Sequence, residues 1–249
     1  MNTTRFPNKF CAALAATGVL LAFVLGPVMA VEPSILGHAA ADNPADQNVR
    51  CIPAAERAGR KLGCFVIHTE TLGKLPKGPL YWHLYRYPSR EAAESAKEAF
   101  SSVVESYGDT WLFTIAAATW HAKGGEKVAT VGPLPTSDAA SYTAEYMEAT
   151  FAPGMRSMVH RHPGPEAWYV LSGEQCLETP GRRTIVRAKE SSVVPEGPPM
   201  ALYGTGKSER RSLVLILHDS SKPMGMPAPD WKPSGLCTGA AESAALNTQ

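Results

Sequence analysis

Two histidines and a glutamate lie close together in the second half of the chain. Residues 158–162 alternate between two sets of side chains, so on a β-strand His160 and His162 would point to the same face. Glu166 follows four residues after His162. Two neutral imidazoles and one carboxylate, with coordination positions left open, form a ligand set for a divalent first-row metal. The set suits Fe, Mn, Ni, Cu or Zn.

The same three residues also have a metal-free interpretation. A single histidine on an apolar strand is more often a hydrogen-bonded core residue than a metal ligand. Burying two imidazoles and a carboxylate together without a metal, however, leaves polar groups that need other partners. We therefore expect His160, His162 and Glu166 to bind metal. His218, at the end of a predicted strand, is the nearby histidine that could add a further ligand.

Local signals place this group between two strands. Pro163-Gly164-Pro165 ends the first strand and turns the chain, so we expect residues 166–171 to fold back alongside it as a second strand. Side chains that share a face with the candidate ligands would then form the apolar walls of a cavity. The expected cavity-lining residues are Met158, Trp168, Val170 and Met200.

The segment that contains these residues has a defined spacing. Five residues separate Gly154 from His160, three separate His162 from Glu166, and six separate Glu166 from Gly173. This pattern resembles the first sequence motif of the cupin superfamily at every fixed position. The resemblance implies a mainly β fold, a double-stranded β-helix or jelly-roll barrel, with a metal bound by the two histidines and the glutamate.

The second motif of that family is incomplete here. Pro195 and Gly197 occupy expected positions, but Met200 stands where the family usually carries a third metal-binding histidine. The resemblance therefore implies three protein ligands rather than four. Met200 itself has two interpretations. It fills the barrel as a flexible apolar side chain, or its soft thioether favours a soft metal such as copper.

The front half of the chain has a different pattern and contains no His-x-His pair, so a second site of this kind is not expected. Residues 64–70, 79–87 and 111–120 predict strands. Between the last two, Ser89 is a good N-cap and residues 90–105 predict a helix. We interpret this β-α-β succession either as an extension packed on the barrel or as the barrel's outer sheet with an inserted helix.

Many short strands separated by Pro and Gly turns follow, as a closed two-sheet barrel requires. The sequence therefore predicts five parts. They are a signal peptide at residues 1–30, a linker at 31–50, an α+β extension or outer barrel sheet at 51–140, the cupin barrel at 141–220 and an irregular tail at 221–249.

Residues 1–30 have the pattern of a secretory signal peptide. Arg5 and Lys9 precede an apolar run at residues 11–26, and Val28-Met29-Ala30 supplies small residues for cleavage. The apolar run is shorter than the ~20 residues that a membrane span needs. We therefore expect a periplasmic or secreted protein that has no membrane association after the leader is removed.

Four cysteines remain in the part that would be exported. An even number in an oxidising compartment indicates two disulfides, although four cysteines allow three connectivities. We expect Cys51 to pair with Cys64, which closes a short loop, and Cys176 to pair with Cys237, which fastens the tail to the barrel.

The charge balance gives no reason to expect a nucleic-acid partner. The formal net charge is +1, and removal of residues 1–30 leaves 22 basic against 23 acidic residues and a charge of −1. Two basic pairs, Arg182-Arg183 and Arg210-Arg211, each begin a predicted strand, where we expect them to be solvated. The expected partner is a small-molecule ligand or substrate, and the family resemblance adds a homodimer.

These features support two main hypotheses about function. In the first, the protein is an exported metal-dependent enzyme of the dioxygenase, decarboxylase or isomerase type, as the resemblance implies, and the metal polarises a small molecule. In the second, it is a periplasmic cupin that binds or senses a small ligand without metal or chemistry. A barrel used only as an interaction scaffold is a third hypothesis. Because the sequence offers no acid or base beyond the metal ligands, it leaves the catalytic residues and the question of enzyme activity open.

Overall fold

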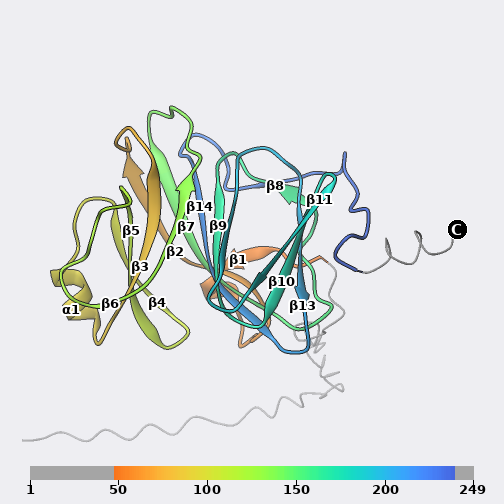
Figure 1. Cartoon of the computed structure of the whole chain (residues 1–249), viewed down its shortest axis with the longest axis horizontal. Helices are drawn as coiled ribbons and strands as arrows, with labels where there is room; N and C mark the ends of the chain where they lie inside the picture. The colour runs from red at the N-terminus through yellow and green to blue at the C-terminus, as the bar shows by residue number, and fades with distance from the viewer. Residues whose placement is uncertain (1–47, 239–249) are drawn as a thin grey trace, which may run out of the picture. The chain divides into compact units, whose positions relative to one another are not determined.

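The computed structural model describes residues 48–238 of the chain (Figure 1). The signal peptide expected at residues 1–30 lies outside the described residues, as do most of the expected linker and the end of the tail. Within the described residues, no helix combines the length and the apolar character needed to cross a bilayer.

The described residues form β-sheets arranged in three layers (Figure 1). The central sheet contains, in spatial order, β1 (Cys51–Pro53), β2 (Gly63–Gly73), β7 (Tyr142–Phe151), β14 (Arg210–Asp219), β9 (Glu166–Ser172) and β12 (Ser191–Val194). The outer sheet contains β4 (Ser101–Ser106), β5 (Asp109–Ala116), β3 (Leu80–Tyr87) and β6 (Glu126–Leu134). The third layer contains a three-stranded sheet, β11 (Arg182–Arg187), β10 (Glu174–Thr179) and β13 (Ala201–Thr205), and a two-stranded sheet, β15 (Met226–Pro227) and β8 (His160–Arg161).

The middle strands of the central sheet, β7, β14 and β9, are buried on both faces, which explains the almost continuous apolar sequences of β14 and β9. Alternate residues of β14 enter different cores: Leu215 packs against the outer sheet, whereas Ile216 packs against the third layer. Side chains of β7 alternate in the same way: Tyr146 packs against the outer sheet and Met147 packs against the third layer. We call these two interiors the outer core and the inner core. A one-residue slip of register would exchange them.

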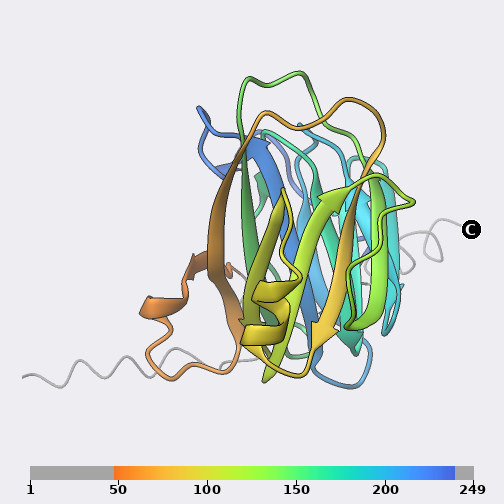
Figure 2. The same cartoon turned by 90° about the vertical axis from the view of Figure 1, so that its left-hand side faces the viewer.

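The outer sheet carries a short helix on its exposed side, α1 (Arg90–Ser95), which faces the viewer in Figure 2. The helix predicted for residues 90–105 is therefore wrong in its second half. Its N-terminus is as expected, because the Oγ of Ser89 accepts a hydrogen bond from the backbone N–H of Ala92 at 3.2 Å. Residues beyond the helix form β4, and Tyr107 and Gly108, both at positive φ, make the hairpin turn into β5.

The error in the helix prediction has a physical cause. Val103 and Val104 are adjacent apolar residues, which fit one side of a helix, but a strand buried on both faces has the same pattern. In the structure Val104 packs in the outer core and Val103 packs under α1. The front half of the chain thus supplies β1 and β2 to the central sheet and the whole of the outer sheet.

Two disulfides connect distant segments, and they are the pairs expected from the sequence. Cys51 and Cys64 are direct partners on the parallel strands β1 and β2. Cys176 of β10 is bonded to Cys237 near the end of the described residues. The carboxylate of Glu178 also accepts hydrogen bonds from the backbone N–H groups of residues 234 and 235. The C-terminal segment is thereby fixed to the third layer.

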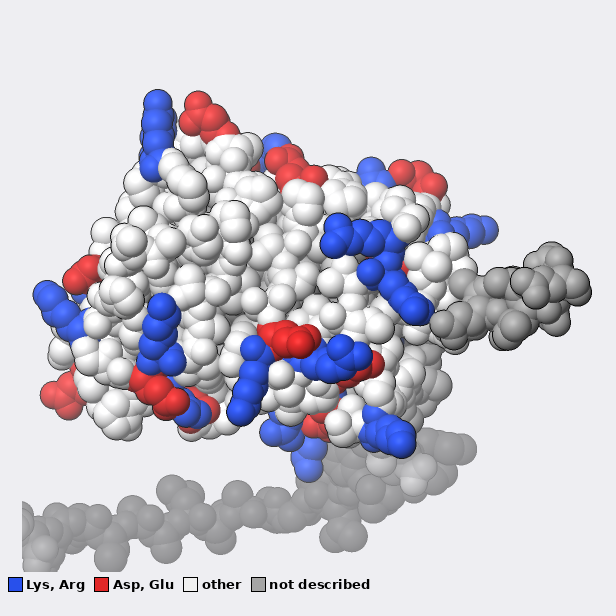
Figure 3. All heavy atoms as spheres, in the orientation of Figure 1, with Lys and Arg blue, Asp and Glu red and all other residues white. Residues whose placement is uncertain are grey.

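The basic pairs behave differently from each other. Arg182 and Arg183 are exposed on the edge strand β11, and on the face drawn in Figure 3 basic and acidic side chains are interspersed. Arg210 is fully buried, so the expectation that it is solvated is wrong. The reason is its register opposite Phe151, which turns the guanidinium into the inner core, 4.5 Å above the phenyl ring. Burial lowers the pKa of Arg210 to about 10.

A buried glutamate fixes the turn between β4 and β5 to the central sheet. Glu148 of β7 is 8% exposed and accepts hydrogen bonds from the Ser106 hydroxyl at 3.1 Å and the Tyr107 backbone N–H at 3.0 Å. It also forms an ion pair with Arg57, which follows the short 3-10 helix η1 (Ala54–Glu56). One carboxylate therefore holds three segments that are remote in sequence.

Glu148→Ala should lower the free energy of unfolding by about 2 kcal/mol, because it leaves buried donors without an acceptor. Glu126→Ala is the matched control, since Glu126 also pairs with an arginine but its side chain is 63% exposed. That variant should differ from the unsubstituted protein by less than about 0.5 kcal/mol. Chemical denaturation with both disulfides intact measures the two changes, and equal losses would show that Glu148 has no special structural role.

Candidate metal centre

A crossing between two sheets brings the candidate ligands together. His160 begins β8, which pairs with β15, so the expected side-by-side pairing of the histidine segment with residues 166–171 is wrong. Strand β9 pairs instead with β12 and β14. The turn Pro163-Gly164-Pro165 carries the chain across the barrel, and a Cβ at its glycine would lie 2.1 Å from the carbonyl oxygen of Leu217. Glu166, the first residue of β9, therefore approaches the histidines from the opposite sheet.

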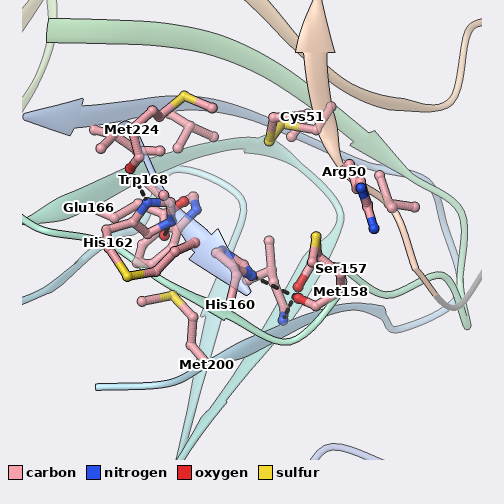
Figure 4. Close-up of a pocket in the computed structure, with 18 of the residues that line it drawn as sticks. Arg50, Cys51, Ser157, Met158, His160, His162, Glu166, Trp168, Met200 and Met224 are labelled. Carbon is pink, nitrogen blue, oxygen red and sulfur yellow. Dashed lines mark hydrogen bonds and ion pairs between the residues drawn. A yellow bond between two sulfur atoms is a disulfide. The ribbon is translucent and has the colours of Figure 1, made fainter. Parts of the chain in front are cut away.

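The three candidate ligands converge on one point, as Figure 4 shows. One ligand atom from each of His160, His162 and Glu166 lies within 4.8 Å of the other two. The two imidazole rings are close to perpendicular, with centroids 4.8 Å apart. His162 and Glu166 are buried, and His160 is partly buried. Among residues 48–238, no other group of three such side chains has this proximity.

Backbone carbonyl groups fix the orientation of both imidazoles. Nδ1 of His160 lies 2.7 Å from the carbonyl oxygen of Met158, and Nδ1 of His162 lies 2.7 Å from that of Met224. Because a carbonyl oxygen only accepts, each Nδ1 carries the hydrogen, and each Nε2 of the neutral ring presents a lone pair. Metal-binding histidines usually donate their second ring N–H in this way.

Two buried acceptor atoms face each other in this arrangement. Nε2 of His162 lies 3.1 Å from Oε2 of Glu166, yet neither atom makes a hydrogen bond. A lone pair next to a carboxylate oxygen in a buried site is unfavourable unless a cation shares the space. A metal ion supplies that charge, and so does a proton on the imidazole. The donor set and its uncompensated atoms therefore fit a divalent metal.

The surroundings affect the protonation of the two histidines in opposite ways. Burial and the neighbouring His162 lower the pKa of His160. Burial also opposes protonation of His162, but attraction to the Glu166 carboxylate outweighs it, and the pKa of His162 is raised. When His162 is protonated, the proton on its Nε2 lies between these two side chains.

The ligand group lies in the wall of a cavity of about 250 Å³ between the central sheet and the third layer. Apolar side chains of both layers form most of the wall, together with residues 49–51, the Cys51–Cys64 disulfide and residues 224–227. The apolar lining residues of the sheets are Ala149, Phe151, Trp168, Met200, Leu202, Val214 and Ile216. Apart from the three ligands, the polar side chains in the lining are those of Arg50 and Ser157.

The residues expected around the metal are not all brought to this cavity. Met158, Trp168 and Met200 line it, but Val170 does not. Val170 is fully buried further along β9, where it is paired with Ser212. His218 also lies outside the group: it does not line the cavity, and its Nε2 is 3.9 Å from Oε1 of Glu145.

Sequence reasoning missed the role of residues 224–227. The sequence predicts an irregular tail there, but Met224 holds His162 through its carbonyl group, and Met224 and Met226 line the cavity. A backbone carbonyl has no sequence signature. Gly225 is the available signal, because a Cβ at this position would lie 2.9 Å from Nδ1 of His162.

Comparison with known proteins gave one family match and several distant structural similarities. A family model for the cupin domain matches residues 147–216. No curated protein matches the chain. Among solved structures, a cupin-2 domain containing protein from Shewanella frigidimarina NCIMB 400 is 16% identical, with 29% of this chain and 68% of that chain covered and a TM-score of 0.26.

Two further solved structures are similarly distant. A DMSP lyase from Ruegeria pomeroyi DSS-3 is 20% identical, with 44% of this chain and 50% of that chain covered and a TM-score of 0.32. A cupin-like protein from Thermotoga maritima MSB8 is 18% identical, with 37% of this chain and 66% of that chain covered and a TM-score of 0.31. This chain thus matches only half of the length of that lyase.

Two facing β-sheets around a His-His-Glu group define a double-stranded β-helix barrel with a candidate metal centre. Together with the match over residues 147–216, this shows that the chain contains a cupin domain.

In the metal-free protein, His162 should titrate above the usual histidine pKa and His160 below it. Glu166→Gln removes the negative charge that attracts the His162 proton, so the pKa of His162 should fall. Nitrogen-15 NMR titration of the two side chains measures both values, and Glu126→Gln, remote and exposed, serves as the control. An unchanged His162 pKa in Glu166→Gln would contradict the proposed electrostatic coupling.

Proposed function

We propose that this cupin binds a divalent first-row metal through His160, His162 and Glu166 and presents it to a small molecule in the adjoining cavity. The observation that carries the proposal is a pair of buried acceptor atoms. Nε2 of His162 and Oε2 of Glu166 lie 3.1 Å apart with no hydrogen-bond donor for either of them among residues 48–238. When bound, a metal with three protein ligands and open positions supplies Lewis-acid polarisation of the small molecule.

The protein's own residues would prepare the site for this role. The carbonyl groups of Met158 and Met224 hold the imidazoles with Nε2 directed at the metal position. Trp168 and the other apolar walls keep water away from the ligand group, which strengthens its electrostatic interactions. A cavity of about 250 Å³ has room for a small molecule.

A metal-dependent enzyme is the first form of this proposal, and a non-catalytic binding cupin is the second. The second is favoured by the cavity lining, in which Ser157 already accepts a hydrogen bond from the Leu202 backbone N–H and no other acid or base accompanies the ligands. Turnover of a bound small molecule by the metal-loaded protein separates the two. We also propose export, which the two disulfides support.

Purified protein should contain a stoichiometric metal that is lost in the double variant His160→Ala, His162→Ala. Removing both imidazoles leaves a single carboxylate, which does not hold a first-row metal at comparable affinity. Plasma mass spectrometry after reconstitution with each candidate ion measures the content. His121→Ala, an exposed histidine outside the site, should keep the metal. Absence of metal in the unsubstituted protein after every reconstitution would remove this proposal.

The cavity mouth adds information about the ligand. Arg50 lines the cavity, is exposed, and makes no hydrogen bond or ion pair within residues 48–238 (Figure 4). An unpaired guanidinium at the edge of an apolar cavity favours a ligand with a carboxylate or another anionic group. We therefore propose a small organic anion as the ligand class.

Small carboxylates should raise the thermal stability of the metal-loaded protein more than their neutral amides do. A ligand at about 100 times its Kd stabilises the folded state by about 2.7 kcal/mol. Arg50→Ala should reduce the preference for the carboxylate of each pair, whereas Arg182→Ala, exposed on β11, should not. Differential scanning fluorimetry measures both effects. Equal stabilisation by acids and amides would contradict the anionic ligand class.

A further inference from the structure

The cavity beside the candidate metal centre is rich in sulfur. Eight methionines occur in the chain, and the side chains of four of them line this one cavity. They are Met158, Met200, Met224 and Met226. The Cys51–Cys64 disulfide forms part of the same wall (Figure 4). Methionine fills irregular apolar space well, but its thioether is also a soft metal ligand, so its position relative to the candidate ligands decides its role.

Met200 is the methionine that the backbone places beside a ligand. The backbone N–H of Met200 donates to the carbonyl of His160 at 2.8 Å, and the N–H of His160 donates to the carbonyl of Met200 at 3.1 Å. Residues paired in this way carry their side chains on the same face of the two strands as direct neighbours. Met200 is 1% exposed, and Figure 4 shows it extending into the cavity beside His160.

Two described methionines that do not line the cavity have contacts at their sulfur atoms. The Sδ of Met155 accepts a hydrogen bond from the Ala152 backbone N–H at 3.3 Å, and the Sδ of Met147 lies 3.9 Å from the Sγ of Cys64. Within residues 48–238, no hydrogen bond engages the Sδ of Met200. Its lone pairs are therefore free to bind a metal held by the neighbouring histidines.

We infer that the Met200 thioether is a further ligand of the metal centre and that the site selects copper, in particular cuprous ion. The inference rests on the ligands of the proposed metal site, and it extends the metals considered there from divalent ions to the monovalent Cu(I). Thioether and imidazole ligands favour Cu(I), whereas a carboxylate and imidazoles alone do not distinguish it from harder first-row ions. Burial of the sulfur under an apolar wall also keeps competing water away from the soft ion.

Met200→Leu keeps the volume and apolar character of the side chain but removes the sulfur. This variant should weaken Cu(I) binding by at least about tenfold, a loss no smaller than that seen when a histidine loses its supporting partner. Its Zn(II) and Ni(II) affinities should stay within about twofold, because the three nitrogen and oxygen ligands are unchanged. Anaerobic competition with bicinchoninate measures Cu(I), and calorimetry measures the other two ions.

Two matched variants sharpen the test. Met155→Leu removes a buried sulfur that does not line the cavity, so its Cu(I) affinity should equal that of the unsubstituted protein. Met200→His replaces the soft ligand by an imidazole and should raise Ni(II) and Zn(II) affinity relative to Cu(I). Copper-edge X-ray absorption of the unsubstituted protein should show a sulfur ligand that is lost in Met200→Leu.

The outcomes separate this inference from the proposed function. Unchanged Cu(I) affinity in Met200→Leu, or a copper spectrum without sulfur in the unsubstituted protein, would overturn the inference, while binding of Zn(II) that depends on His160 and His162 would leave the proposed site intact. Failure of the unsubstituted protein to bind Cu(I), Zn(II), Ni(II) or any other candidate ion would overturn both. If Met200→Leu does not fold, the spectrum of the unsubstituted protein decides.

Discussion

Burial of the central sheet on both faces is the constraint on which the rest of the structure depends. Antiparallel sheets usually keep one solvated face, but here the outer sheet covers one side and the barrel interior lies on the other. Side-chain alternation must then separate two cores rather than core from solvent. Polar residues buried in this sheet need hydrogen-bond partners, and the carboxylates of Glu148 and Glu166 have different kinds of neighbour. Glu148 meets donors on the outer side, whereas Glu166 meets a histidine lone pair on the inner side.

The candidate metal centre on the inner side of the sheet is built from segments that are far apart in sequence. Glu166 comes from the central sheet, His160 comes from β8, and His162 directly follows β8. The carbonyl that orients His162 comes from Met224. The last of these segments has little regular structure of its own, so it depends on covalent and hydrogen-bonded attachment. The Cys176–Cys237 disulfide and Glu178 provide that attachment. The disulfide thus fixes the C-terminal segment at a point beyond Met224, whose carbonyl group orients His162 in the candidate metal centre.

The sequence predicted what depends on local pattern, and it failed where tertiary context decides. The spacing from His160 to Glu166 indicated the fold and a ligand group that the structure brings together, because strand alternation and glycine positions are local properties. The second half of the predicted helix became β4, since adjacent valines serve equally for a doubly buried strand. The strand pairing around Pro163-Gly164-Pro165 and the Met224 carbonyl had no signature, because both depend on contacts with remote backbone.

Protonation and metal binding are alternative ways of resolving the same electrostatic conflict. The raised pKa of His162 means that its interaction with Glu166 stabilises the metal-free fold fully at pH values below the unfolded histidine pKa. That stabilisation is lost as the pH rises through the folded-state pKa, because the proton leaves and two acceptors face each other. At pH values above the folded-state pKa of His162, a metal ion would bind best, since it would not have to displace the proton from Nε2. Replacement of the His162 proton by a metal ion at the candidate site would therefore relieve the same conflict between the two acceptor atoms.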